Sequence, residues 1–155
     1  VGITVTGKGI PLDAYKLDHA CGAVEAAVIE QKDKDIVIVE GQGSILHPGS
    51  SATLPLMRGT CPTHMILCHI ARNDSLRSLE NIKIPDLKKF IILNEELSSV
   101  LGTYPKSKVI GVAINTVEMS DNEAKEFIKN TEKITGLPVT DVIRYGGEKI
   151  FNQLI

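Results

Sequence analysis

The sequence predicts an α/β domain with three layers, in which helices cover both faces of a mainly parallel sheet. Short β-branched and apolar runs alternate along the chain with longer segments of helical periodicity. Several of these runs are continuously apolar, which is typical of parallel strands buried on both faces. The length of 155 residues, with 43% hydrophobic and 23% charged residues, fits a globular chain that forms one domain or a large part of one.

The first part of the chain is predicted to form a strand, a helix and a second strand. Residues 3–6 are β-branched and are closed by the turn sequence Gly7-Lys8-Gly9, which predicts a short strand. Apolar residues recur at helical spacing from Leu12 to about Gln31, so this segment is predicted to be an amphipathic helix. Residues 36–39 are Ile-Val-Ile-Val without polar alternation, and they are the clearest predicted strand.

Later elements follow the same alternation. In chain order, we expect a short helix over 52–58, a buried strand over 65–69, a helix over 86–101, a buried strand over 109–114, a helix from Ser120 to about Gly136, an edge strand over 138–143 and a terminal helix over 148–154. The helix after Ser120 has the clearest boundaries. Ser120 and Glu123 have the spacing of a capping box, and Gly136 supplies the left-handed residue that commonly ends a helix.

Charge and cysteine content exclude several classes of function. The net charge is -2, and the basic residues are scattered, so the chain lacks the basic field expected of a nucleic-acid-binding protein. No apolar run approaches the roughly 18 residues that a membrane helix needs. Three cysteines without a disulfide framework indicate a reducing compartment, and we therefore expect a cytoplasmic protein.

Candidate functional residues follow the predicted strands, because ligands of open parallel sheets collect beyond the carboxyl ends of the strands. The main candidate is the loop after Val39. It places the carboxylate of Glu40 at a strand tip and follows it with Gly41 and Gly43, which let backbone N–H groups approach an anionic ligand. A glutamate in this position can hold a magnesium-bound water or act as a base, and Gln42, Ser44 and His47 add uncharged donors. The alternative is a tight turn with a solvated Glu40.

Other patterns have competing interpretations. Gly2, Gly7 and Lys8 have the spacing of a phosphate loop, but Gly9 replaces the Ser or Thr that binds magnesium, so a strand and turn are predicted instead. The group Cys61, His64, Cys68 and His69 resembles zinc ligands, but neighbouring strand residues point to opposite faces, which favours buried structural cysteines.

Three polar residues near predicted element ends also have two interpretations each. Asp13 and Asp18 lie near the start of the first helix, where either a substrate-binding role or favourable interaction with the helix dipole would explain them. Asn115 follows the strand predicted over 109–114 and either recognises a purine edge or forms a turn.

Taken together, these motifs resemble a known family. The matching segments are Gly9 to Asp13, Asp18 with Gly22 to Glu25, Glu40 to Pro48, Leu56 to Gly59, Asn115-Thr116, and Gly136 to Asp141 with Arg144 to Gly146. They are similar to the carboxyl-terminal phosphate-loop domain of a bacterial and archaeal family of formerly unknown function that includes D-glutamate N-acetyltransferases. That domain is more distantly similar to dethiobiotin synthetase.

The resemblance implies a P-loop NTPase-like fold over residues 1–155 that lacks its first strand, phosphate loop and helix. It also implies that a separate N-terminal domain of the same protein is missing. By the resemblance, Glu40 is a magnesium or substrate carboxylate, and Asn115 with Val139 and Arg144 frames the adenine of ATP or acetyl-CoA. Arg58 and Arg72 are candidates for binding substrate carboxylates, because a planar guanidinium pairs with a carboxylate through two hydrogen bonds.

Three functions remain open at this stage. The first is N-acetyl transfer from acetyl-CoA to a small acidic amino acid such as D-glutamate, with Glu40 or His47 taking the amine proton. The second is ATP- and Mg²⁺-dependent activation of a carboxylate, as in dethiobiotin synthetase. The third is a non-catalytic nucleotide-binding module. A sheet without its first strand and helix would expose apolar surface, so we also expect a homo-oligomer.

Overall fold

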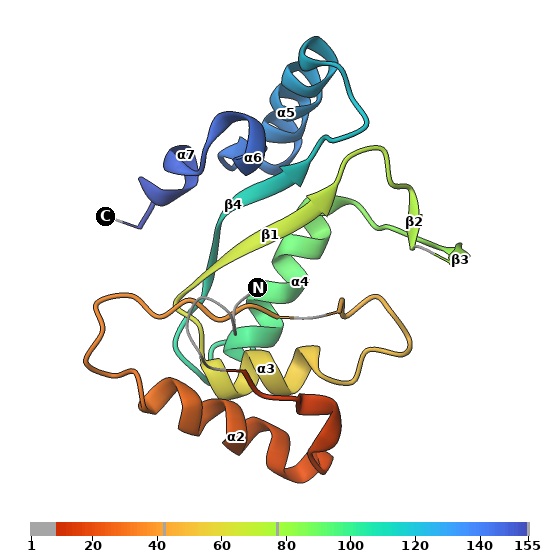
Figure 1. The fold of residues 1–155 in the computed structure, drawn as a ribbon. Coiled ribbons are helices and arrows are strands. Elements are labelled where there is room, and N and C mark those ends of the chain that lie inside the picture. The colour runs from red at the N-terminus through yellow and green to blue at the C-terminus, as the bar shows by residue number, and fades with distance from the viewer. Residues whose placement is uncertain (1–8, 42, 77, 155) are drawn as a thin grey trace. The chain divides into compact units, whose positions relative to one another are not determined.

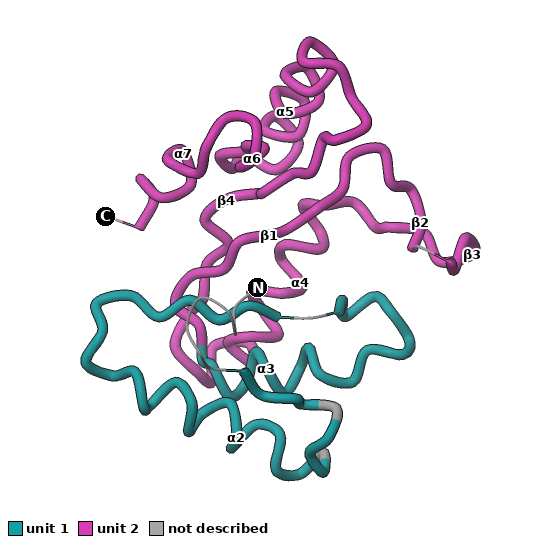
Figure 2. Tube along the Cα trace, in the orientation of Figure 1, with its two compact units in different colours: residues 1–61 teal, residues 62–155 magenta. Residues whose placement is uncertain are grey.

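The computed structural model describes residues 9–41, 43–76 and 78–154 (Figure 1). The chain separates into two compact units, residues 1–61 and 62–155 (Figure 2). The strand predicted over residues 3–6 and the phosphate-loop-like spacing from Gly2 to Lys8 lie outside the described residues.

The described residues of the first unit contain two helices that pack closely against each other. A 3-10 turn, η1 (Leu12–Ala14), comes before helix α2 (Leu17–Ile29), and helix α3 spans Thr53–Thr60. The helices approach each other at Gly59, where an added Cβ would lie 2.4 Å from the carbonyl oxygen of Cys21. Only glycine permits so close an approach. Both helices predicted in this part of the chain are confirmed, although α2 begins after η1 instead of at residue 12.

The strand predicted over residues 36–39 is wrong. The described residues of the first unit contain no strand, and these four residues have no regular secondary structure. Ile38 is 88% exposed. An apolar run becomes a strand only where a neighbouring strand completes its hydrogen bonds, and none of the described residues of this unit provides that neighbour.

The second unit is built on a parallel sheet with the order β1-β4-β5. The central strand β4 (Lys108–Asn115) pairs in parallel with β1 (His64–Ile70) and with β5 (Val139–Thr140). Val112, at the middle of β4, is fully buried. The three parallel strands predicted in this part of the chain are confirmed.

Within residues 62–76 and 78–154, four helices accompany this sheet. They are α4 (Leu87–Ser99), α5 (Asp121–Thr135), α6 (Val142–Tyr145) and α7 (Glu148–Phe151). The predicted capping box of α5 is present, and Gly136 ends the helix in the left-handed conformation with φ of 72°. The Asp86 side chain caps α4 by accepting a hydrogen bond from the Lys89 amide.

Helices lie on both faces of the sheet. Val112 packs in one core cluster with Ile91 of α4 and Ile128 of α5. The neighbouring Gly111 faces α7, because a Cβ added there would lie 2.8 Å from the Ile150 side chain. Successive strand residues point to opposite faces, so the predicted three-layer arrangement is confirmed in this unit.

Three details differ from the prediction. Strand β1 alternates between exposed and partly buried residues and is not covered on both faces. Strand β5 is shorter than predicted, because the Asp141 side chain accepts hydrogen bonds from the amides of Ile143 and Arg144 and starts α6. An antiparallel ribbon of β2 (Ser75–Leu76) and β3 (Leu79–Lys83) was not predicted. Within the described ranges, no helix has the length and apolar character needed to cross a bilayer.

Candidate functional site

The carboxyl ends of the three parallel strands bring several candidate residues to one edge of the second unit. Ile70 of β1 is in register with Asn115 of β4, and the amide of Ala71 donates to the Asn115 carbonyl at 3.0 Å. Ala113 of β4 pairs with Thr140 of β5. Arg72, Asn115 and Asp141 therefore follow their strands at the same edge. We call the residues at this edge, 71–72, 115–121 and 141–145, the strand-tip crest.

A buried carboxylate organises the crest. Asp141 is 3% exposed, and its Oδ2 accepts hydrogen bonds from the amide of Thr116 at 2.9 Å and from the Thr116 hydroxyl at 2.5 Å. Its Oδ1 accepts from the amides of Ile143 and Arg144 at 3.0 and 3.2 Å. Burial favours the neutral acid, but the hydrogen bonds outweigh burial and hold the pKa of Asp141 below its usual range.

Arg144 binds two backbone carbonyl groups of the loop that contains Thr116. Its Nη2 donates to the carbonyl oxygens of Thr116 at 2.9 Å and Met119 at 2.6 Å. Sequence analysis assigned Arg144 to a cofactor, whereas the structure shows its guanidinium on the protein backbone. Val139, also assigned to the cofactor, is 1% exposed and belongs to the hydrophobic core.

Asn115 is one of the exposed polar residues of the crest. Its Oδ1 accepts from the Val117 amide at 2.9 Å, which forms the local turn that sequence analysis gave as one of two alternatives. Val117 and Ile143, which flank the loop, are 73% and 91% exposed. A polar amide accompanied by exposed apolar side chains suits a nucleobase, which has a polar edge and apolar faces.

Arg72 lies at the tip of β1 in the left-handed conformation, with φ of 59°. Its Nη2 lies 2.6 Å from Oε1 of Glu123, in the first turn of α5. Hydrogen bonds from Ser120 and from Arg72 lower the pKa of Glu123 to about 2. A non-glycine residue in this conformation is uncommon and is often found at functional positions. The arginine is thus held at the crest by an ion pair.

A second network braces the crest from α5. The Tyr145 hydroxyl donates to Oδ1 of Asp121 at 2.6 Å, and Nζ of Lys125 lies 2.7 Å from Oδ2 of Asp121. The hydrogen bonds from Lys125 and Tyr145 lower the pKa of Asp121. Sequence analysis named Thr116, Asp141 and Tyr145 only as parts of family-matching segments and predicted neither these contacts nor the pairing of Thr116 with Asp141. The available signal was the spacing of Asp141 before residues 143 and 144, which is the spacing of a helix cap.

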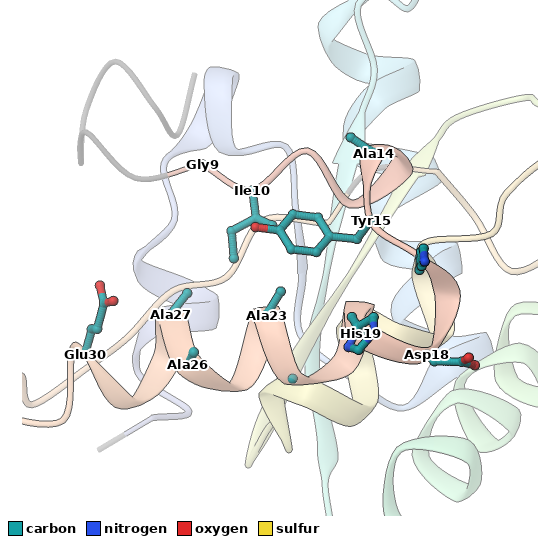
Figure 3. A pocket seen from close by; sticks show the side chains of 12 residues that line it. Gly9, Ile10, Ala14, Tyr15, Asp18, His19, Ala23, Ala26, Ala27 and Glu30 are labelled. Atoms are coloured by element: carbon teal, nitrogen blue, oxygen red, sulfur yellow. The ribbon is translucent and has the colours of Figure 1, made fainter.

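The first unit contains a groove of about 860 Å³ beside α2. Figure 3 shows Ile10 and Tyr15 facing α2 across the groove, and small side chains of the helix beneath them. Asp18, a predicted substrate-binding residue, lines the groove together with His19 and Glu30. Asp13 lies in η1.

The loop after residue 39 is ordered by short-range contacts. Ser44 Oγ accepts from the Leu46 amide at 3.2 Å, and His47 Nδ1 accepts from the Gly49 amide at 3.0 Å. Glu40 is exposed and is not among the residues that line the groove beside α2.

The backbone structure explains why glycine occupies positions 41 and 43 of this loop. A Cβ at Gly41 would lie 2.6 Å from the Leu56 side chain, and Gly43 has φ of 81°. Gln42 lies outside the described residues, and Arg58 is an exposed residue of α3. The loop therefore presents Glu40 and His47 to solvent from a constrained backbone.

Across residues 9–41, 43–76 and 78–154, no three His, Cys, Asp or Glu side chains gather as a metal-binding group. The single carboxylate of Glu40 fits Mg²⁺ only as a partial ligand, which is compatible with an ion held mainly by water and phosphate oxygens. Cys61 and Cys68 are exposed, so the prediction of buried cysteines is wrong for these two.

Comparisons with known proteins agree with this fold. The family description "Domain of unknown function (DUF1611_C) P-loop domain" matches residues 1–151. A crystal structure of a DUF1611 family protein from Anabaena variabilis ATCC 29413 has a TM-score of 0.95 and 42% identity, covering 99% of this chain and 45% of that chain.

Two curated relatives carry a functional name. Proteins named D-glutamate N-acetyltransferase, from Tritonibacter scottomollicae and a Pseudoalteromonas species, are 31% and 29% identical over 154 residues, which is 99% of this chain. The match covers 46% of each relative, so the chain spans about half the length of the curated relatives it matches.

Proposed function

Because the chain belongs to the DUF1611 family and forms its P-loop domain, we propose that the full-length protein is an N-acetyltransferase that uses acetyl-CoA to acetylate D-glutamate or a similar small acidic amino acid. The observation that carries the proposal is the match over 99% of this chain to two proteins named D-glutamate N-acetyltransferase. We further propose that residues 1–155 belong to one P-loop-like domain of that protein.

The strand-tip crest supports this proposal by its chemistry. Asn115 offers an amide that can both donate and accept hydrogen bonds, as the edge of adenine requires. The exposed Val117 and Ile143 offer apolar contact to the faces of the base. In the proposal, the crest binds the adenine of acetyl-CoA.

Acetyl-CoA supplies an activated acyl group, so an N–C bond forms at the amine while the C–S bond of the thioester breaks. The attacking amine must lose a proton, which the departing thiolate can finally receive. Glu40 and His47 are the proposed proton acceptors, because both are exposed side chains on the ordered loop. Arg58 in the first unit and Arg72 in the second unit are each proposed, independently of the other, as a candidate for binding a substrate carboxylate. Asp13, Asp18, Gln42 and Ser44 complete the proposed substrate contacts.

The decisive experiment measures release of free CoA thiol by the full-length protein with acetyl-CoA and D-glutamate. Glu40→Gln is expected to lower kcat by about 100-fold, the usual minimum for the loss of a general base. Glu126→Gln is a matched control, since Glu126 is an exposed glutamate of α5 outside the proposed site. Full activity in Glu40→Gln would exclude Glu40 as the base, and absence of acetyl transfer in the wild type would refute the proposed activity.

The P-loop description of the family favours a second candidate, ATP- and Mg²⁺-dependent activation of a carboxylate. In that function the crest would bind the adenine of ATP, and Glu40 would contact Mg²⁺ through water. Phosphate release that rises when a carboxylate substrate is added would support it. Tight nucleotide binding without turnover of any substrate would favour a non-catalytic module instead.

Two properties of the full-length protein are also proposed. A cytoplasmic location agrees with the three cysteines, none of which forms a disulfide. Homo-oligomer formation is supported by apolar side chains of β1, since Ile66 and Ile70 are 49% and 55% exposed. Light scattering during size-exclusion chromatography measures the oligomeric state directly.

A further inference from the structure

We infer that Asp141 and Arg144 are positioning residues, which fix the side chain of Asn115 in the orientation that selects an adenine base. The inference rests on the proposed function, because it concerns how the crest recognises the adenine-bearing ligand. It assigns a role to the buried Asp141–Thr116 pair, and it gives Arg144 a different role from the direct cofactor contact predicted from the sequence.

The first step concerns the peptide group between Asn115 and Thr116. The Thr116 amide and hydroxyl both donate to Oδ2 of Asp141, and Thr116 is 1% exposed. An ionised carboxylate that accepts several hydrogen bonds in a buried place holds its donors more firmly than a neutral acceptor would. The backbone immediately after Asn115 is therefore anchored to the β5 tip.

The second step concerns the peptide group between Thr116 and Val117. Its carbonyl oxygen accepts from Nη2 of Arg144 at 2.9 Å, and its N–H, which belongs to Val117, donates to Oδ1 of Asn115 at 2.9 Å. The peptide group is planar, so fixing the carbonyl also fixes the direction of the N–H. Arg144 thereby determines where Oδ1 of Asn115 lies.

The third step concerns what a fixed Asn115 can recognise. Its Oδ1 keeps one lone pair after accepting from Val117, and its Nδ2 group carries two N–H donors. The side chain therefore presents one acceptor beside a donor. Adenine offers the complementary pair, an amino donor beside a ring-nitrogen acceptor. Guanine places the acceptor O6 where adenine has its amino group, and this would face Oδ1 of Asn115 unfavourably.

The test uses the full-length protein and two acetyl donors. Acetyl-CoA carries adenine, whereas S-acetylpantetheine has the same thioester without the nucleotide. Asp141→Asn and Asn115→Ala are each expected to raise the KM for acetyl-CoA about tenfold, the equivalent of one lost hydrogen bond. The kcat for acetyl-CoA and the KM for S-acetylpantetheine are expected to stay unchanged. Thr116→Ser, which keeps the hydroxyl, is expected to retain the wild-type KM values.

Controls separate positioning from general damage. Ile134→Ser changes a 53% exposed side chain at the far end of α5 and is expected to leave both KM values unchanged. If Asp141→Asn does not fold, Thr116→Val, which removes only the hydroxyl bond, takes its place. A lower melting temperature with an unchanged KM for acetyl-CoA, or an equal change for both donors, would show a purely structural role and overturn the inference.

Failure of the proposed function gives a different result. If the wild type transfers no acetyl group, the acetyltransferase proposal fails, and the positioning role is then measured by thermal shift with ATP and with GTP. The inference requires that the wild type is stabilised more by ATP than by GTP, and that Asp141→Asn reduces this difference. A wild type that does not distinguish ATP from GTP would overturn the inference.

Discussion

Replacing Asp141 by Asn perturbs the most deeply buried carboxylate group described in the crest. The wild-type side chain is 3% exposed and accepts four hydrogen bonds, two of them on Oδ2 from Thr116. Asparagine keeps one acceptor oxygen for the amides of residues 143 and 144, but it turns an NH₂ donor toward the two Thr116 donors. Each lost hydrogen bond to a charged group costs about 1.5–3 kcal/mol. Because the two bonds share one donor residue and are not additive, we expect a total loss of about 3 kcal/mol.

Urea unfolding of the protein, followed by circular dichroism at pH 7 and at lower pH, measures this difference. Since the folded-state pKa of Asp141 is lowered, its stabilising effect is fully present above the unfolded-state pKa of about 3.9 and is lost as the pH falls through the folded-state pKa. The free-energy gap between wild type and Asp141→Asn should therefore narrow below about pH 4. Asp121→Asn, at an exposed ion pair, is the control and should shift unfolding much less. The reasoning would be refuted if, at pH 7, Asp141→Asn lowered the free energy of unfolding by no more than Asp121→Asn does.

Three further predictions concern stability, each measured by thermal unfolding. Gly59→Ala should lower the melting temperature, because its Cβ would lie 2.4 Å from the Cys21 carbonyl oxygen. Gly22→Ala in α2 is the control, because a Cβ there would have nothing within 4 Å, and it should raise stability by up to about 1 kcal/mol. Equal melting temperatures for the two variants would contradict the close helix contact. Gly136→Ala should destabilise by about 1 kcal/mol, since φ is 72° at the end of α5, and no change would argue against this helix end. Val112→Ala should cost about 2 kcal/mol, because two methyl groups are removed from a fully buried site; a loss below about 0.5 kcal/mol would mean that this position is not in the core.

The sequence was most informative where local chemistry alone determines structure. Ser120 and Glu123 predicted the start of α5, and the capping box is present. Residues 36–39 show the limit of this reasoning, because an apolar β-branched run needs a pairing strand that its own residues do not contain. The role of Asp141 was equally inaccessible, since its partner Thr116 lies 25 residues away and becomes a neighbour only through the pairing of β4 with β5.

The two groups of candidate residues differ in how they are held, and this difference bears on their proposed roles. In the crest, the backbone around Thr116 is fixed by side chains from another element, so Asn115 is oriented before any ligand arrives. Such preorganisation reduces the entropy lost on binding, which suits recognition of an invariant group such as adenine. In the loop that follows residue 39, the hydrogen bonds of Ser44 and His47 span only two residues each, and Glu40 is exposed. Local hydrogen bonds of this kind can rearrange at small energetic cost when a ligand binds, and catalytic hydrogen bonds often tighten only in the complex with substrate. The contrast therefore favours recognition by the crest and proton transfer by the loop, and not the reverse assignment.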